Sequence, residues 1–267
     1  MKRVLVVILA VVLALACALA LAQQTQPAHV DAQAVTAVSQ SLSSMGISGY
    51  TQGVPQTTAG VAIQDSVATG TVSLWDGTSG TITVKTKGLA LLRTDMNING
   101  TQTTTVTNNG SGYVVQAGTK SVLPVCVTHY RRCGTIPVLS RMADYTQPNT
   151  NLIYVGLETL NGSSVHHIQT TSVPTDGTPA DVESLISEFH VFLNTTTQLP
   201  VKTLSFDQSP VAIQNRIPIE TYYNNYQSVN GVLVPFHITR YHRGQVQMDI
   251  VLTSVQFNVG VSVTDFQ

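Results

Sequence analysis

Histidines and glutamates are the residues of this chain whose chemistry could serve catalysis or metal binding. His166 and His167 are adjacent, whereas His190, His237 and His242 are spread along the chain. Adjacent residues of a strand point to opposite faces, so His166 and His167 would not readily share an ion, and His190 is isolated. The chain has only four glutamates, and it contains no nucleophile elbow, zinc-protease motif, phosphate-binding loop or dinucleotide fingerprint. We therefore expect a non-catalytic protein with no metal and no cofactor.

Cys126 and Cys133 form the other candidate group. Outside the cytoplasm, two cysteines separated by six residues most often form a disulfide. Their spacing matches no established redox or zinc motif, so we expect a structural disulfide that closes a short loop. The alternative is a redox or metal-binding pair.

The first 22 residues determine the expected compartment. Lys2 and Arg3 precede a long uncharged apolar run, which ends in Ala20-Leu21-Ala22 before a polar stretch. A basic start, an apolar run and small residues ahead of a polar segment are typical of a cleavable secretory signal. We therefore expect cleavage after Ala22 and a periplasmic or secreted protein.

The remainder is expected to be a flexible tether over 23–30 and a single domain over 31–267, with no transmembrane segment after cleavage. Two alternatives stay open for the start of the chain. The apolar run is nearly long enough to be an uncleaved membrane anchor, and Cys17 could carry a lipid.

The composition excludes one class of partner. Charged residues make up 10% of the chain, and the formal net charge is -1. Because there is no basic stripe, binding to nucleic acid through its phosphates is not expected. The aliphatic and β-branched content nevertheless predicts a folded domain, with a surface rich in Thr, Ser, Asn and Gln.

Two patterns predict the secondary structure that must position any site. Val35, Val38, Leu42 and Met45 recur at helical spacing after Asp31, an acceptable N-cap, and Gly46 supplies a stop. From about residue 61 the period becomes two. Along 90–96, Leu92 and Met96 fall on one face, and Arg93 falls on the other.

Turn dipeptides separate the alternating segments. An Asn-Gly or Asp-Gly pair between such segments is the strongest local signal for a hairpin. They predict a meander of about ten neighbouring antiparallel strands, drawn from twelve alternating segments between residues 61 and 257. The pairs are Asp76-Gly77, Lys87-Gly88, Asn99-Gly100, Asn109-Gly110, Asn161-Gly162, Asn230-Gly231 and Arg243-Gly244.

Two segments interrupt the meander. Residues 122–150 contain three prolines and the cysteine pair, and Pro137 could open a short helix with Val138 and Met142 on one side. A capping-box-like start at Thr178 predicts a second short helix.

The final third of the chain carries a specific order of motifs. A turn leads into a strand that starts Leu199-Pro200, and Tyr222-Tyr223-Asn224-Asn225-Tyr226 precedes Asn230-Gly231 and Pro235-Phe236. A last strand ends in Val255-Gln256-Phe257-Asn258, followed by Phe266. This order resembles the outer-membrane lipoprotein-sorting protein superfamily, the LolA/LolB-like half-barrels.

The resemblance implies a mainly β (α+β) fold, a curved antiparallel half-barrel sheet with a few covering helices. It also implies a non-catalytic carrier of lipid, acyl chains or another apolar ligand. Arg93 occupies a strand comparable to the one whose arginine holds the lid in that family. The residues expected to line the ligand cavity are Leu92, Met96, Val138, Met142, Phe192, Phe236 and Phe257.

Physical reasoning leads to the same cavity, because three short helices would not cover the apolar face of so large a sheet. One alternative is a sheet that fills its own interior, as small barrels do, in a structural or protein-interaction module of the cell envelope. Another is a hydrolase whose catalytic residues are dispersed along the chain.

Overall fold

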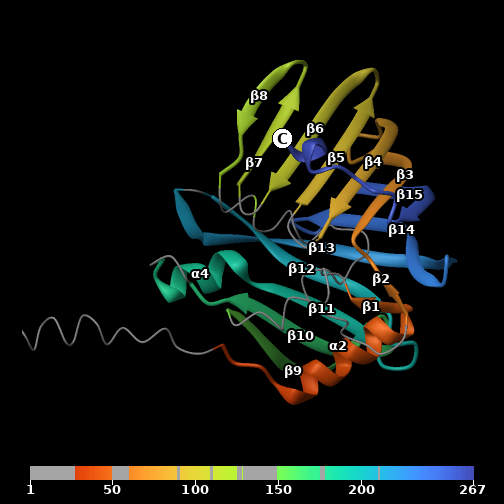
Figure 1. Ribbon diagram of the computed structural model, residues 1–267. Coiled ribbons are helices and arrows are strands. Elements are labelled where there is room, and N and C mark those ends of the chain that lie inside the picture. Colours follow the sequence, from red (N-terminus) through yellow and green to blue (C-terminus); the bar gives the residue numbers. More distant parts are fainter. Residues whose placement is uncertain are drawn as a thin grey trace, which may run out of the picture.

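The computed structural model describes residues 28–49, 60–88, 91–108, 111–124, 128, 149–174, 178–209 and 211–267. A single antiparallel sheet of thirteen strands dominates the fold, in the order β8-β7-β6-β5-β4-β3-β15-β14-β13-β12-β11-β10-β9 (Figure 1). The sheet is open and strongly curved, consistent with a half-barrel. The expected fold class is therefore confirmed.

The sheet consists of two meanders, which we call the N-terminal wing and the C-terminal wing. The N-terminal wing contains β3 (Asp65–Leu74), β4 (Ser79–Lys87), β5 (Leu91–Ile98), β6 (Thr101–Asn108), β7 (Ser111–Gln116) and β8 (Thr119–Val122). The C-terminal wing contains β9 (Thr150–Leu160), β10 (Ser163–Ser172), β11 (Phe189–Asn194), β12 (Pro200–Ser209), β13 (Ala212–Val229), β14 (Val232–His242) and β15 (Gln245–Phe257). Within each wing every strand pairs with its neighbour in the chain, and only the pairing of β3 with β15 joins the wings.

Two-residue turns of the expected chemistry connect many of these strands. Asn99, Asn161, Asn230 and Arg243 all adopt positive φ angles, and each is followed by a glycine with positive φ. Two successive positive φ angles are the signature of the type I′ turn, whose twist matches that of the flanking strands. Asn109-Gly110 lies outside the described residues.

The expected number of strands was too low. All twelve alternating segments contain strands, and β8 adds one that the sequence analysis missed. The turn before β8 is Ala117-Gly118, again with both φ angles positive (48° and 78°). Alanine seldom occupies such a position, so the sequence carried no turn signal there. A short parallel pair, β1 (Ile47–Gly49) and β2 (Val61–Ala62), forms a second sheet.

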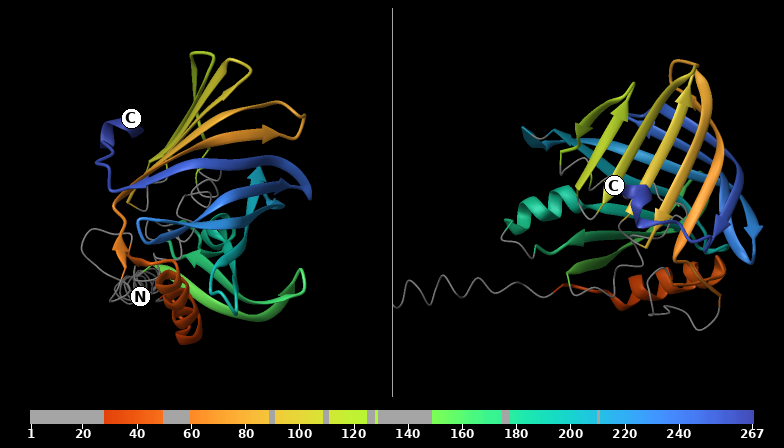
Figure 2. Two further views of the ribbon diagram at one scale, coloured as in Figure 1. Left: turned by 90° about the vertical axis from the view of Figure 1, so that its right-hand side faces the viewer. Right: turned by 45° about the horizontal axis from the view of Figure 1, so that its top comes forward.

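The two wings face each other across the concave side of the sheet. Figure 2 shows them diverging from the junction of β3 with β15, and in Figure 1 the strands of the N-terminal wing run steeply across those of the C-terminal wing. The pairing of β15 shifts register beside β3 and again beside β14. Such bulges bend a strand and increase its twist.

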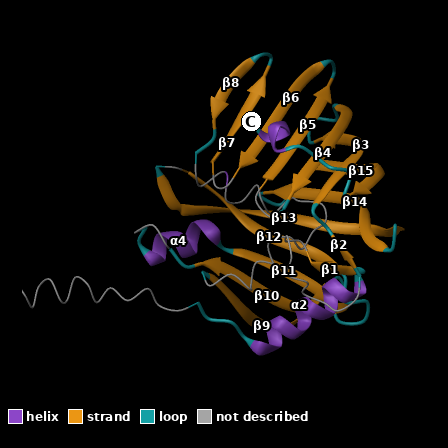
Figure 3. Cartoon of the chain, in the orientation of Figure 1, coloured by secondary structure: helices purple, strands orange, loops and turns teal. Residues whose placement is uncertain are grey.

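Helix α2 (Ala32–Ser44) covers one end of the concave side (Figure 3). Val38, Leu42 and Met45 are fully buried in the main core and Val35 is partly buried, which confirms the expected stripe. Asp31 precedes the helix, but its carboxylate does not cap it. Instead, Asp31 Oδ2 accepts a hydrogen bond from the backbone N–H of Tyr154 in β9.

Gly46 ends α2 with a φ of +73°, the left-handed conformation that glycine adopts without strain. A Cβ at this position would lie 2.1 Å from the carbonyl oxygen of Gly231, in the turn between β13 and β14. The helix therefore ends at a point of close backbone contact with the C-terminal wing.

Helix α4 (Ala180–Ser187) follows β10, as the sequence analysis expected, although its N-cap is Pro179 and no side chain caps it. A short 3-10 helix, η3 (Val263–Phe266), ends the chain on the outer face of the N-terminal wing. No helix among the described residues is long and apolar enough to span a membrane.

Several expectations fall outside the described residues. These are the signal segment with its Ala22 cleavage site, Cys17, the Cys126–Cys133 disulfide, and the helix carrying Val138 and Met142.

Candidate functional site

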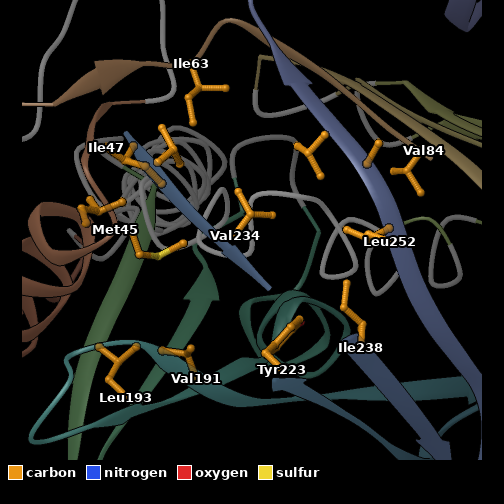
Figure 4. Close-up of a cluster of buried hydrophobic side chains, with 14 of the residues drawn as sticks. Met45, Ile47, Ile63, Val84, Val191, Leu193, Tyr223, Val234, Ile238 and Leu252 are labelled. Carbon is orange, nitrogen blue, oxygen red and sulfur yellow. The ribbon is translucent and has the colours of Figure 1, made fainter. Parts of the chain in front are cut away.

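A cavity of about 270 Å³ lies between the two wings. The main core fills the concave side beneath α2, and Figure 4 shows part of it, with Val84 of one wing and Tyr223 and Ile238 of the other facing a common interior. These three residues also line the cavity. The cavity is therefore the part of the concave side that the chain's described side chains do not fill.

The N-terminal wing lines the cavity with one aligned row of side chains from four strands. Val84, Thr94, Thr105 and Val114 pair in register from β4 to β7, and all four line the cavity. Residues paired across antiparallel strands share a face, so strand alternation alone places this row inward. The same reasoning places Leu92 and Met96 inward from β5, and both line the cavity.

The C-terminal wing contributes an apolar row and a polar row. Tyr223, Ile238 and Ile250 pair in register across β13, β14 and β15, and all three line the cavity. Two positions along the same strands, Thr221 pairs with Arg240, and both also line the cavity. A separation of two residues corresponds to about 6.6 Å along a strand.

A bulge in β15 adds a polar side chain to the second row. Met248 pairs with Arg240 and Val246 pairs with Tyr241, so Gln247 is the extra residue between these pairs. A bulge lets consecutive side chains point to the same side, and both Gln247 and Met248 line the cavity. The side-chain oxygen of Gln247 is buried, without a hydrogen-bond partner among the described residues.

The three aromatic residues expected in the cavity do not line it, and they lie in two different places. Phe236 and Phe257 belong to the main core but not to the cavity lining. Phe192 lies on the outer face, where its ring stacks on His167 with 4.3 Å between ring centroids. On β11, Val191 and Leu193 point into the core instead.

Arg93 also faces away from the cavity. Its guanidinium makes an ion pair with Asp95 at 2.8 Å and donates a hydrogen bond to the backbone carbonyl of Asp265 in η3. Hydrogen bonding to Asp95 raises the pKa of Arg93, although its partial burial opposes this. The contacts of Arg93 thus hold the end of the chain against the outer wall of the N-terminal wing.

Two lysines and a small apolar cluster complete this attachment, which we call the C-terminal clasp. Lys85 Nζ pairs with Asp265 at 3.0 Å, and Lys87 donates to the carbonyl of Val261. The hydrogen bond from Lys85 is the main reason that the pKa of Asp265 is lowered. Phe266 is buried with Val106 of β6 on this outer face. The clasp covers the back of the wall that lines the cavity.

The outer face of the C-terminal wing carries a row of hydrogen-bonded ionisable groups. His167 Nδ1 contacts Glu158, His167 Nε2 lies 2.8 Å from His190 Nδ1, and His190 Nε2 lies 2.7 Å from Glu188. The expectation that His190 is isolated was wrong, because the pairing of β10 with β11 places it beside His167. Glu188 also pairs with Arg216 at 2.9 Å.

His166 points to the opposite face and bonds the hydroxyl of Tyr154, so the two adjacent histidines have separate partners. Within the described part of the chain, no three His, Cys, Asp or Glu side chains are grouped so that they could hold a metal ion. The cavity between the wings is therefore the candidate functional site.

Comparison with known proteins shows the fold. No protein-family model matches the sequence, and no curated protein sequence matches it either. The chain is similar to a solved domain from Vibrio parahaemolyticus that is assigned as an outer membrane lipoprotein-sorting protein. The identity is 10%, the TM-score is 0.53, and the match covers 87% of this chain and 95% of that one.

Two further solved structures match most of this chain. A DUF1329 family protein from Desulfovibrio piger matches at 12% identity and a TM-score of 0.54, over 88% of this chain and 96% of that one. A LolA superfamily protein from Nitrosomonas europaea matches at 11% identity and a TM-score of 0.47, over 76% of this chain and 89% of that one. The match with the Vibrio parahaemolyticus domain confirms, at the level of the fold, the half-barrel resemblance inferred from the motifs in the final third.

Proposed function

We propose that this chain is an exported, non-catalytic carrier or binder of a lipid, an acyl chain or another apolar ligand, which it holds in the cavity between the two wings. The observation that carries the proposal is a space of about 270 Å³ that is lined from both wings, mainly by aliphatic side chains and threonines. This volume is slightly below the range of roughly 300–1,000 Å³ that is usual for small-molecule sites. It suits one acyl chain or one small ligand.

The lining supports binding rather than catalysis. Aliphatic side chains and threonines dominate it, whereas the contacting side chains of Glu158, His167, His190 and Glu188 lie on the outer face. An apolar wall favours an apolar guest, because about 25 cal/mol is gained for each Å² of apolar surface removed from water. The similar domain from Vibrio parahaemolyticus, assigned to lipoprotein sorting, agrees with this proposal and with a location in the cell envelope.

Two measurements test the proposal. Native mass spectrometry of gently purified protein should reveal an organic-extractable ligand, and the emptied protein should bind a fluorescent fatty acid. The proposal would be contradicted if the purified protein carried no ligand and also did not bind the fluorescent fatty acid.

A pair of variants locates the binding. Thr94→Phe should fill the cavity from the middle of the N-terminal wall and abolish fatty-acid binding. Asn97→Phe is the matched control, because Asn97 is an exposed residue of the same strand on the opposite face. We expect this control to bind as the wild type does. Equal binding by all three proteins would place the ligand elsewhere.

A further inference from the structure

The polar row of the cavity gives it two chemically different ends. Along β14, Val232, Val234 and Phe236 lie in the core, and Ile238 follows in the cavity wall. The backbone N–H of Leu233 donates to Met45, so this end of β14 lies against the end of α2. Arg240 comes next, nearer the turn between β14 and β15. The lining therefore changes from apolar to polar along the strand, away from α2.

Arg240 is the only charged residue among the described residues that line the cavity. Beside it, the bulge turns Gln247 inward, and Thr221 pairs with Arg240 from the other neighbouring strand. The amide oxygen of Gln247 is buried without a partner among the described residues. A half-turn of this amide exchanges its oxygen and nitrogen, and the nitrogen can then donate a hydrogen bond to a carboxylate or phosphate oxygen in the cavity. Positive charge and polar groups thus gather beside the apolar row of Tyr223, Ile238 and Ile250.

We propose that the cavity selects an anionic amphiphile, with its apolar chain along Tyr223, Ile238 and Ile250 and its carboxylate or phosphate head at Arg240 and Gln247. This inference rests on the proposed function, and it adds the ligand's charge and orientation. Arginine suits this role because its planar guanidinium donates paired hydrogen bonds to carboxylate and phosphate oxygens. Charge-assisted hydrogen bonds are roughly twice as strong as neutral ones, so an acid should bind more tightly than the matching alcohol.

The test compares ligands that differ only in the head. Undecanoate, decyl phosphate and decanol, which all carry a ten-carbon alkyl chain, compete with a neutral environment-sensitive dye at pH 8, where both acids are ionised. We expect at least one anion to displace the dye at a concentration at least about tenfold below that of decanol, equivalent to about 1.4 kcal/mol. The preferred anion identifies the head as a carboxylate or a phosphate.

Three variants assign the effect to one side chain. Arg240→Gln should remove the preference for the anion, so that neither anion displaces the dye better than decanol does, and Arg240→Lys should retain part of the preference. Arg243→Gln is the charge-matched control, because Arg243 is exposed in the turn between β14 and β15. It should keep the full preference.

The outcomes separate this inference from the function on which it rests. Equal affinity of the wild type for acid and alcohol, or a preference that survives in Arg240→Gln, would overturn the inference while leaving the carrier function intact. Failure of the dye and all three amphiphiles to bind would overturn both.

Discussion

The row of Glu158, His167, His190 and Glu188 shows how strand pairing can create a chemical group that no local motif contains. Its three contacts need three protons if each is to be a hydrogen bond, but two neutral imidazoles supply only two. His190 Nε2 can donate to Glu188, and His167 Nε2 can donate to His190. His167 Nδ1 is then left without a hydrogen for Glu158. That contact becomes a hydrogen bond only when one more proton binds.

Burial influences the pH at which His167 binds this proton. It lowers the pKa of His167, and the hydrogen bond with Glu158 offsets this only in part. Burial tends to raise the pKa of Glu188, but the hydrogen bonds from His190 and Arg216 outweigh it, so that this pKa is lowered. The folded state therefore favours a neutral His167 and an ionised Glu188.

The lowered pKa of His167 makes the stability of the protein depend on pH. The pKa of His167 is lower in the folded chain than its ordinary value of 6.5, so the unfolded chain binds more protons just below that pH. The free energy of unfolding should be constant above about pH 7 and should fall as the pH drops through 6.5. Thermal unfolding between pH 8 and pH 5 measures this.

His167→Gln should show a shallower fall over this range. NMR titration of the His167 ring should give a midpoint below 6.5. A midpoint above that value would contradict the prediction.

At the scale of elements, the end of α2 offers a test of close backbone packing. Gly46→Ala should destabilise the protein in two ways, because the φ of +73° strains a side chain and the new Cβ would meet the carbonyl oxygen of Gly231 at 2.1 Å. Gly244→Ala is the control, since its φ is +74° and nothing lies within 4 Å of the added Cβ.

We expect Gly244→Ala to lose about 1–2 kcal/mol of unfolding free energy from backbone strain alone. Gly46→Ala should lose clearly more. Chemical denaturation measures both, and equal losses would show that the contact of α2 with the β13–β14 turn is not a constraint.

Individual elements also show how far sequence reasoning extends. The Asn-Gly and Arg-Gly turns and the strand alternation correctly placed most hairpins and put Leu92 and Met96 on one face and Arg93 on the other. The same reasoning placed Phe192 in the cavity. Five consecutive residues of β11, from Phe189 to Leu193, are buried, so burial there does not alternate and the hydrophobic pattern carries no information about the face.

The polar row of the cavity was beyond sequence reasoning for another reason. Gln247 reaches the lining only because a bulge shifts the register of β15, whereas Arg240 lies on the same face of β14 as Ile238 by simple alternation. The alternating pattern in the sequence does not reveal a bulge, since the same residues also fit a regular strand.

At the scale of the whole molecule, the cavity depends on the junction of the two wings. Gly70 of β3 lies at this junction, where an added Cβ would meet the carbonyl oxygen of Val251 at 2.3 Å. Gly70→Ala should therefore force β3 and β15 apart. Gly80→Ala is the control, because its added Cβ would meet Asn97 at 1.9 Å within the N-terminal wing.

Hydrogen exchange should separate the two variants. Gly70→Ala should speed exchange in β3 and β15 and weaken ligand binding, since the walls of the cavity would no longer be held at one distance. Gly80→Ala should speed exchange mainly in β4 and β5. If both variants gave the same exchange pattern, the junction would have no special role.

The junction also determines the order in which the molecule can be assembled. Thr69 and Thr253 lie across it with their hydroxyl oxygens 3.5 Å apart, yet they are separated by 184 positions in the chain. Pairings between such distant residues form slowly, whereas hairpins between neighbouring strands form early. The hairpins of each meander can thus form before the wings are joined. The cavity can enclose a ligand only after β15 has paired with β3.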